Sequence, residues 1–195
     1  MFYREIENNL KIGLSIPQFG EEMFSLTDQN RGYLKAWLPW LDKVKKVEDT
    51  KEFLRLQLKR FGEDEAIHLS IFYKNKIVGV LGYNQLDLIN GIGHVGYWLG
   101  EEYTGIGIMT KAVIELIHLG FENWPIQKIE IHCADNNFKS RAIPEKLGFK
   151  NEGTIRRTAK VYEEYQDHII YGLLKKEYFA DKLFNTGKGN SPAAG

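Results

Sequence analysis

Residues 94–110 read HVGYWLGEEYTGIGIMT, and they join a predicted strand to a predicted helix through a glycine-rich loop. The strand covers His94–Leu99, and the helix begins near Ile108. Glycines let a backbone approach a ligand closely, and the free N–H groups at the start of a helix attract an anion. The loop therefore predicts a site for a pyrophosphate. The helix has one buried face, whose members recur at helical spacing: Met109, Ala112, Val113, Leu116, Ile117 and Gly120.

Two other nucleotide-binding loops share part of this pattern, and the P-loop of ATPases is the first. Gly100 and Gly105 have its spacing. However, Ile106-Gly107 stands where that loop requires Lys followed by Ser or Thr. The sequence therefore argues against a P-loop ATPase.

A dinucleotide-binding fingerprint is the second alternative. Gly105 and Gly107 match its first two glycines, and Glu130 lies at about the distance of its acidic residue. Thr110 replaces the third glycine, and five residues separate Leu99 from the first glycine, which should follow the strand at once. This alternative is weaker but stays open, as does an ordinary strand-to-helix turn.

The rest of the chain alternates strands and helices around this unit. The order strand–helix–strand in the middle of the chain predicts a parallel pair inside a mixed sheet, so the fold class is α/β. The predicted strands cover residues 10–16, 67–73, 77–86, 94–99, 128–134, 149–155 and 168–174. The predicted helices cover residues 18–37, 48–61, 108–121 and 138–147.

Composition narrows the class of protein. The 195 residues suit one domain, predicted over residues 1–180, followed by a flexible tail over residues 181–195. Twenty-six basic residues balance 26 acidic ones, which gives no support for nucleic acid or an anionic membrane as a partner. No apolar run is long enough to span a membrane. Cys133 is the single cysteine, so a reducing, cytoplasmic location is expected.

Three motifs occur in order along the second half of the chain. They are GYWL at 96–99, GIGIMT at 105–110 and NFKSRAIPEKLGF at 137–149. Together they resemble the GNAT acetyltransferases, and within them the Rim-type branch, which acetylates N-termini of ribosomal proteins. The segments EGTIR at 152–156 and DHIIY at 167–171 are similar to that branch too. The resemblance implies a central, mostly antiparallel sheet with a splayed parallel pair and flanking helices.

The resemblance also implies acetyl-CoA as co-substrate. The loop matching Thr104–Met109 binds the pyrophosphate through backbone amides, and the strand matching Tyr97–Leu99 pairs with the pantetheine arm. A helix start suits a pyrophosphate, and a free strand edge suits the amide-bearing pantetheine. The implied cofactor-binding residues are Tyr97, Trp98, Leu99, Thr104, Gly105, Ile106, Gly107, Ile108, Met109, Thr110, Asn137 and Ser140.

Ser140 is the candidate catalytic residue. Many relatives place a general-acid tyrosine four residues before the Gly-Phe pair, but here that place is Pro144, which has no proton to give. In the Rim-type branch the serine matching Ser140 is the candidate instead, and its alternative role is capping of the helix. Met109 also departs from the family, which often has Gly or Ala there, and it could crowd the loop. A glutamate base of some Rim-type relatives has no match within Arg156–Lys160.

Other polar and aromatic residues give weaker signals. The resemblance assigns the stretch around Trp37 and Trp40 to the acceptor channel, although buried packing is the alternative. Asp167 matches an acidic residue of the Rim-type branch, with either a structural or an acceptor-binding role. Cys133 is expected to pack inside a strand. The histidines show no metal-ligand spacing, so no metal site is predicted: His68, His94, His118, His132 and His168.

These observations predict transfer of an acetyl group from acetyl-CoA to a primary amine. Direct attack in a ternary complex is the simplest scheme, because no Cys–His pair supports a covalent enzyme intermediate. The expected acceptor is the N-terminal α-amino group of a ribosomal protein. A small-molecule amine (amino acid, polyamine or antibiotic) is the first alternative, and a non-catalytic acyl-CoA-binding module is the second. The sequence leaves the general base and the oligomeric state, including a homodimer, open.

Overall fold

The computed structural model describes residues 3–180, and the predicted tail over residues 181–195 lies outside the described residues. The strands are β1 (Tyr3–Glu7), β2 (Leu10–Leu14), β3 (Ile67–Tyr73), β4 (Lys76–Asp87), β5 (Ile92–Leu99), β6 (Lys128–Ala134), β7 (Lys150–Val161) and β8 (Glu164–Leu174). The α-helices are α1 (Gly20–Gln29), α2 (Arg31–Leu34), α3 (Val47–Gly62), α4 (Ile108–Asn123), α5 (Phe138–Lys146) and α6 (Lys175–Ala180). Three 3-10 turns cover Pro17–Phe19, Pro39–Lys43 and Glu101–Tyr103.

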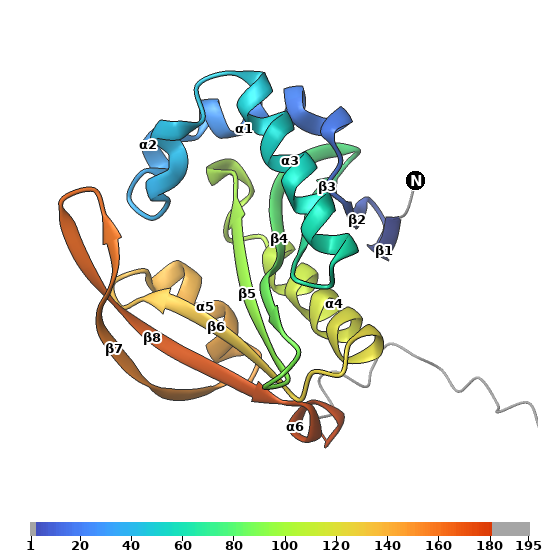
Figure 1. Cartoon of the computed structure of the whole chain (residues 1–195), viewed down its shortest axis with the longest axis vertical. Coiled ribbons are helices and arrows are strands. Elements are labelled where there is room, and N and C mark those ends of the chain that lie inside the picture. The colour runs from blue at the N-terminus through green and yellow to red at the C-terminus, as the bar shows by residue number, and fades with distance from the viewer. Residues whose placement is uncertain (1–2, 181–195) are drawn as a thin grey trace, which may run out of the picture.

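One mixed sheet holds all eight strands of the described chain, in the order β1-β2-β3-β4-β5-β6-β8-β7. Neighbouring strands are antiparallel except β5 and β6, which run parallel. The crossover between these two contains α4, as a parallel connection requires. The predicted mixed α/β fold with a parallel pair in its middle is confirmed. Figure 1 shows β5 and β6 meeting at one end of the molecule and diverging toward the other.

The N-terminal third differs from the prediction in two places. Tyr3–Glu7 forms an edge strand against β2, although its alternation is only between exposed and half-buried side chains. The single helix predicted over residues 18–37 is two helices, because Asn30 leaves the helical conformation. The Asn30 side chain donates to the carbonyl of Leu26 at 2.9 Å and accepts the N–H of Glu101 at 2.8 Å. The break therefore anchors the loop that follows β5.

Helices cover both faces of the sheet, and β4 shows this in two adjacent residues. Val80 packs with Met23 of α1 and Leu54 of α3 on one face. Leu81 belongs to the larger core on the opposite face, which contains the buried side of α4. Successive strand residues point to opposite faces, so this alternation fixes the register of β4. Within the described residues, no helix is both long and apolar enough to cross a membrane.

Gly120 of α4 marks the tightest approach of this helix to the sheet. Tyr83 of β4 is fully buried, and its hydroxyl donates to the carbonyl of Leu116 at 3.1 Å. A Cβ at Gly120 would overlap the Tyr83 hydroxyl. Burial of that hydroxyl leaves the ring no open space to move into. The glycine in the apolar face of α4 is therefore a packing requirement.

Gly120→Ala is expected to lower the free energy of unfolding by about 1–3 kcal/mol, because overpacking outweighs the better helix propensity of alanine. Gly62→Ala at the end of α3 is the matched control, since a Cβ there meets nothing within 4 Å. The control should gain up to about 1 kcal/mol. Denaturant unfolding of both variants measures the difference. Equal effects in the two variants would remove the packing role of Gly120.

Candidate active site

The parallel pairing of β5 and β6 covers only four residue pairs, from Ile92 with Lys128 to Val95 with Ile131. Beyond Val95, β5 stays paired with β4 and β6 stays paired with β8. The two strands therefore diverge, and within residues 3–180 the edge of β5 that faces β6 has no further strand partner. The result is a wedge with an unpaired main-chain edge on one side.

A cavity of about 840 Å³ occupies this wedge. Its walls come from β3, β4, β5, β6 and β8, from α1 and α3, from the segment before α3, and from the start of α5. It brings together six of the predicted site residues: Trp37, Trp40, Tyr97, Trp98, Asn137 and Ser140. Leu99, the segment from Thr104 to Thr110 and Asp167 do not line it.

Asn137 and Ser140 begin α5 at the rim of the wedge. Asn137 is the N-cap, and its side chain accepts the N–H of Ser140 at 3.1 Å. Asn137, and not the Ser140 hydroxyl, therefore caps α5. The Ser140 hydroxyl caps no backbone group. It donates to the Tyr97 hydroxyl at 3.3 Å and lies 3.3 Å from the Cys133 thiol.

Tyr97 and Cys133 were not recognised from the sequence as neighbours of this serine. The Tyr97 hydroxyl donates to the Ser140 carbonyl at 2.9 Å. Burial raises the pKa of Tyr97 well above its ordinary value, and burial also raises the pKa of the Cys133 thiol. Both groups therefore keep their protons at neutral pH. The Ser140 hydroxyl therefore lies between two neutral groups, the Tyr97 hydroxyl and the Cys133 thiol. Cys133 packs inside its strand as expected and also contacts Ser140.

The glycine loop lies outside the cavity, between β5 and α4. Gly105 and Gly107 have φ values of 80° and 86°, so both need the left-handed conformation that glycine adopts without strain. Gly107 is the N-cap of α4, and no side chain caps this helix. The first N–H groups of α4 are therefore available to an anion. The predicted helix start at Ile108 is confirmed.

Two side chains of this loop lie differently from expectation. Met109 is 6% exposed and packs in the core beneath α4, so the expectation that it could crowd the loop is wrong. Helical geometry turns this side chain inward while its N–H stays at the helix start. Ile106, by contrast, is 58% exposed. Thr104 donates its hydroxyl to the carbonyl of Glu101 at 2.8 Å, which ties the loop to the preceding turn.

Trp37 and Trp40 stand on the wall of the cavity opposite the strands. Arg31 fixes this wall, because its guanidinium donates to the carbonyl of Leu41 at 2.8 Å and to the carbonyl of Val44. Both tryptophans stay partly exposed, with Trp40 at 36%. The wall therefore presents aromatic surface to the cavity rather than to the protein core.

Asp167 lies in the β7–β8 hairpin, behind the cavity wall. Its carboxylate accepts the backbone N–H of Arg157 at 2.7 Å, where β7 has a register shift and a φ of 52°. Its neighbours Gln166 and His168 line the cavity instead. This geometry favours the structural role that the sequence left open for Asp167.

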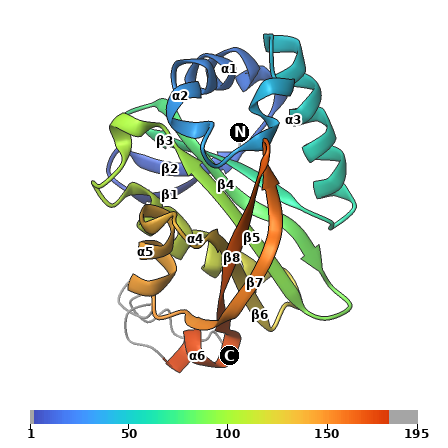
Figure 2. The ribbon, with the colours of Figure 1, turned by 90° about the vertical axis from the view of Figure 1, so that its left-hand side faces the viewer.

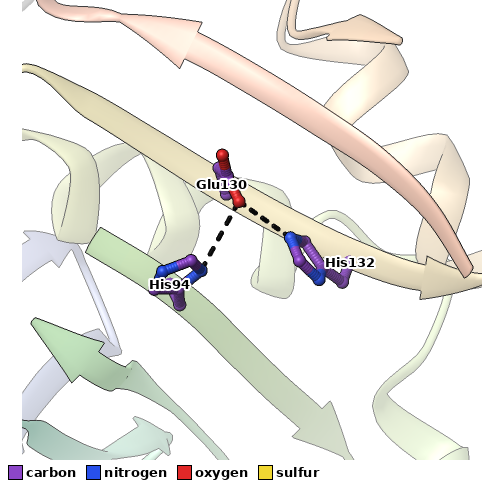
Figure 3. Close-up of side chains that lie close together, drawn as sticks. All are labelled: His94, Glu130 and His132. Carbon is purple, nitrogen blue, oxygen red and sulfur yellow. Dashed lines mark hydrogen bonds and ion pairs between the residues drawn. The ribbon is translucent and has the colours of Figure 1, made fainter. Parts of the chain in front are cut away.

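A cluster of His94, Glu130 and His132 lies at the narrow end of the wedge (Figure 3). One carboxylate oxygen of Glu130 lies 3.5 Å from His94 Nδ1 and 2.9 Å from His132 Nε2. The two imidazole rings are perpendicular, with centroids 5.8 Å apart. The sequence gives no spacing that would group the histidines, yet the fold brings His94 and His132 together. Only the register of the parallel pair β5–β6 could have predicted this, and the sequence alone does not fix that register.

Comparison with known proteins matches this geometry to one family. The family model described as an acetyltransferase (GNAT) domain matches residues 20–150. The chain is 30% identical over 183 residues to the "Putative ribosomal N-acetyltransferase YdaF" of Bacillus subtilis (strain 168), covering 93% of this chain and all of that protein. It is 24% identical over 167 residues to the ribosomal-protein-serine acetyltransferase of Escherichia coli (strain K12), covering 86% of this chain and 93% of that one.

Solved structures share the fold. The microcin C7 self immunity acetyltransferase MccE, solved in complex with acetyl-CoA and AMP, superposes with a TM-score of 0.83 at 28% identity. The match covers 87% of this chain and 94% of that protein. The similarity thus extends over the wedge, the glycine loop and the start of α5. This chain belongs to the GNAT family of acetyl-CoA-dependent N-acetyltransferases.

Proposed function

We propose that this enzyme acetylates the N-terminal α-amino group of a protein, with a ribosomal protein as the acceptor. The observation that carries the proposal is a second hollow beside the wedge that shares part of its lining. A second hollow of about 570 Å³ adjoins the cavity, and both are lined by Trp37 and Gln166. When the terminal amine of a peptide enters the wedge, the residues that follow it extend outward. The second hollow can bind those residues.

The outer hollow lies between α2 and the tip of the β7–β8 hairpin, which approach each other in Figure 2. Lys35 stacks over the ring of Tyr162 at 4.8 Å, and Gln166 donates to the carbonyl of Ala36 at 3.4 Å. Glu163 and Glu164 stand at the hairpin tip, where Glu163 lies 3.5 Å from Lys160. The rim therefore carries both acidic and basic side chains and does not select a ligand by net charge.

The names of the relatives point to the same acceptor class. One relative is named as a ribosomal N-acetyltransferase and another as a ribosomal-protein-serine acetyltransferase. Both alignments run over most of this chain, so they include the segments that line the acceptor path. These names support a protein N-terminus as the acceptor.

The residues around the wedge fit acetyl-CoA. The uncapped start of α4 offers N–H groups to the pyrophosphate, and the unpaired edge of β5 offers main-chain partners to the pantetheine amides. Acetyl-CoA supplies the activated acetyl group, and the N–H groups of β5 stabilise negative charge on the thioester oxygen during attack. Ser140 donates a hydrogen bond as charge builds on the sulfur, with Tyr97 holding the Ser140 carbonyl.

Gly107→Ala is expected to weaken CoA binding about tenfold or more, because the new Cβ strains the left-handed conformation and enters the space in front of α4. Gly91→Ala is the matched control, since Gly91 has a φ of 69° at the opposite end of β5. Both variants should lose about 1–2 kcal/mol of stability from the same backbone strain. Isothermal titration with CoA separates them. Equal CoA affinities would remove the pyrophosphate from this loop.

Ser140→Ala is expected to lower kcat by roughly 10²-fold, at the low end for proton donation because a serine hydroxyl is a weak acid. The Asn137 cap survives, since it holds the N–H of Ser140 and not its hydroxyl. CoA affinity and thermal stability should therefore match the wild type. Tyr97→Phe is the companion variant and should lose only a few-fold in kcat, as a positioning group. A Ser140→Ala kcat within twofold of wild type would show that the thiolate leaves without this hydroxyl.

A small-molecule amine is the second candidate acceptor. The specific observation that favours it is the 28% identity to MccE, whose structure contains AMP beside acetyl-CoA. Trp37 and Trp40 on the cavity wall suit a flat, aromatic portion of such a molecule. A ligand of that size would occupy the inner cavity and leave the outer hollow empty.

An acceptor screen with acetyl-CoA, read by release of free thiol, decides between the two classes. N-terminal peptides of ribosomal proteins should be better substrates than amino acids, polyamines or aminoacyl nucleotides. Trp37→Ala should raise the KM of a peptide acceptor several-fold and leave the KM of acetyl-CoA nearly unchanged, because Trp37 lines both hollows. Trp124→Phe is the control for tryptophan loss outside both hollows. A preference for small amines would replace the protein acceptor.

A further inference from the structure

Proton removal from the acceptor amine has no assigned residue, and the narrow end of the wedge offers one. His94 lies opposite Glu130 in the parallel register, and His132 follows Glu130 by two residues. Side chains two apart on a strand share a face, so β6 presents Glu130 and His132 together toward His94. Figure 3 shows both imidazoles turned toward the same carboxylate.

This cluster lies at the apex of the wedge. The last parallel pair is Val95 with Ile131, so His94 stands just before the divergence and His132 just after it. All three side chains line the same cavity as Ser140. Ser140 at the start of α5 and the cluster on β5 and β6 therefore line one cavity.

One hydrogen bond and one charge contact hold the cluster together. The Glu130 carboxylate can only accept, so His132 Nε2 donates to it at 2.9 Å. His94 Nδ1 lies 3.5 Å from the same oxygen, within ion-pair range. A neutral imidazole carries a lone pair on one of its two nitrogens, so neutral His94 can accept a proton. Lys128 donates to the second oxygen of Glu130 at 2.7 Å, which keeps this carboxylate ionised and held in place.

The charges around His94 suit a base at neutral pH. Burial lowers the pKa of His94 below 6.5; Glu130 and Asp87 of β4 raise it, while His132 and Lys128 lower it. Burial raises the pKa of Glu130, but hydrogen bonds from Lys128 and His132 bring it below its ordinary value. Three further groups belong to this environment. Glu152 of β7 is ion-paired with Lys128, while burial and His132 lower the pKa of His168 of β8 and Asp135 beyond β6 raises it.

We propose that His94 is the general base that accepts the proton of the acceptor ammonium, directly or through one water, with Glu130 and His132 as positioning residues. This inference rests on the proposed transfer to an amine. His94 takes one proton from the ammonium, and the neutral nitrogen forms the C–N bond as the C–S bond breaks. Ser140 passes its proton to the leaving sulfur and regains one from solvent. His94 releases its proton to solvent, and the second nitrogen proton also leaves to solvent, so the net release is one proton per turnover.

A shared cation is the competing explanation of the cluster, and Lys128 argues against it. The Lys128 ammonium already occupies one oxygen of Glu130, the carboxylate of the cluster, at 2.7 Å. A divalent ion at the other oxygen would lie close to this like charge. Activity that survives EDTA supports the proton role, whereas activity abolished by EDTA and restored by Zn²⁺ overturns it.

The pH profile of kcat/KM for the acceptor tests the base. In the wild type, activity should rise with pH through a pKa below 6.5, because only neutral His94 accepts a proton. His94→Gln should lower kcat at pH 7 about 10²-fold, and its profile should lack this rise, which is the acid limb of the wild-type profile. Its rate should then follow deprotonation of the free amine, near pH 8 for an α-amino group. CoA affinity should stay at the wild-type value.

Glu130→Gln tests the positioning role of Glu130 through the pKa of the acid limb, which a purely structural role of Glu130 would leave unchanged. Glu130 raises the pKa of His94, so its loss should shift the acid limb to lower pH while kcat also falls. His94→Asn is a second variant for the case in which His94→Gln fails to fold. His118→Gln on α4 is the histidine control, because His118 does not line the cavity. This control should keep the wild-type profile.

The outcomes separate this inference from the proposed acceptor. The profiles are measured with the best amine in the acceptor screen, whether peptide or small molecule, so a wrong acceptor class does not affect them. A folded His94→Gln enzyme with kcat within twofold of wild type and an unchanged acid limb overturns the base. NMR titration of the imidazoles tests the pairing without turnover: an equal pKa of His94 in wild type and Glu130→Gln also overturns it.

Discussion

The parallel contact between β5 and β6 is only four residue pairs long, and the active site exists because it stops at Val95 and Ile131. Neither strand ends there, since β4 and β8 hold their outer edges beyond the divergence. The inner edge of β5 is left with main-chain groups that have no strand to pair with. Buried main-chain groups without partners are costly, so such an edge is stable only when water or a ligand satisfies it. An amide-rich cofactor arm is the ligand class that replaces a missing strand most directly.

Two parts of the wedge bring different chemistry to the same cavity. At the start of α5, Ser140 sits among the neutral hydroxyl of Tyr97 and the neutral thiol of Cys133, whose protons are kept by burial. At the apex, His94 is held by the Glu130 carboxylate and is kept neutral mainly by burial. The groups that can donate a proton and the group that can accept one therefore line different parts of the same cavity. This separation lets one site hold both in their useful protonation states at the same pH.

Local signals predicted the elements around the glycine loop well. The start of α4 follows from Gly107 and the helical spacing after it, and β6 matches its predicted range. The edge strand Tyr3–Glu7 was not predicted. Neither of its faces is buried, so its sequence lacks the alternation of apolar and polar residues that marks a half-buried strand. The site was predictable where one motif contained it, as with Asn137 and Ser140. His94 and His132 were not, because strand register brings them together and no local pattern encodes that register.

Acceptor choice depends on a different part of the molecule from the chemistry. His94, Glu130 and His132 stand on β5 and β6 in the middle of the sheet, and Ser140 stands at the start of α5 against them. The acceptor path runs instead between the segment carrying Trp37 and the tip of the β7–β8 hairpin. Arg31 braces the first of these through two backbone carbonyls, and Asp167 braces the second at an irregular turn of β7. Changes at the path can therefore alter which amine enters without disturbing the wedge. The proposed division is compatible with one scaffold serving relatives whose names give different acceptors, a ribosomal-protein serine and a ribosomal-protein alanine.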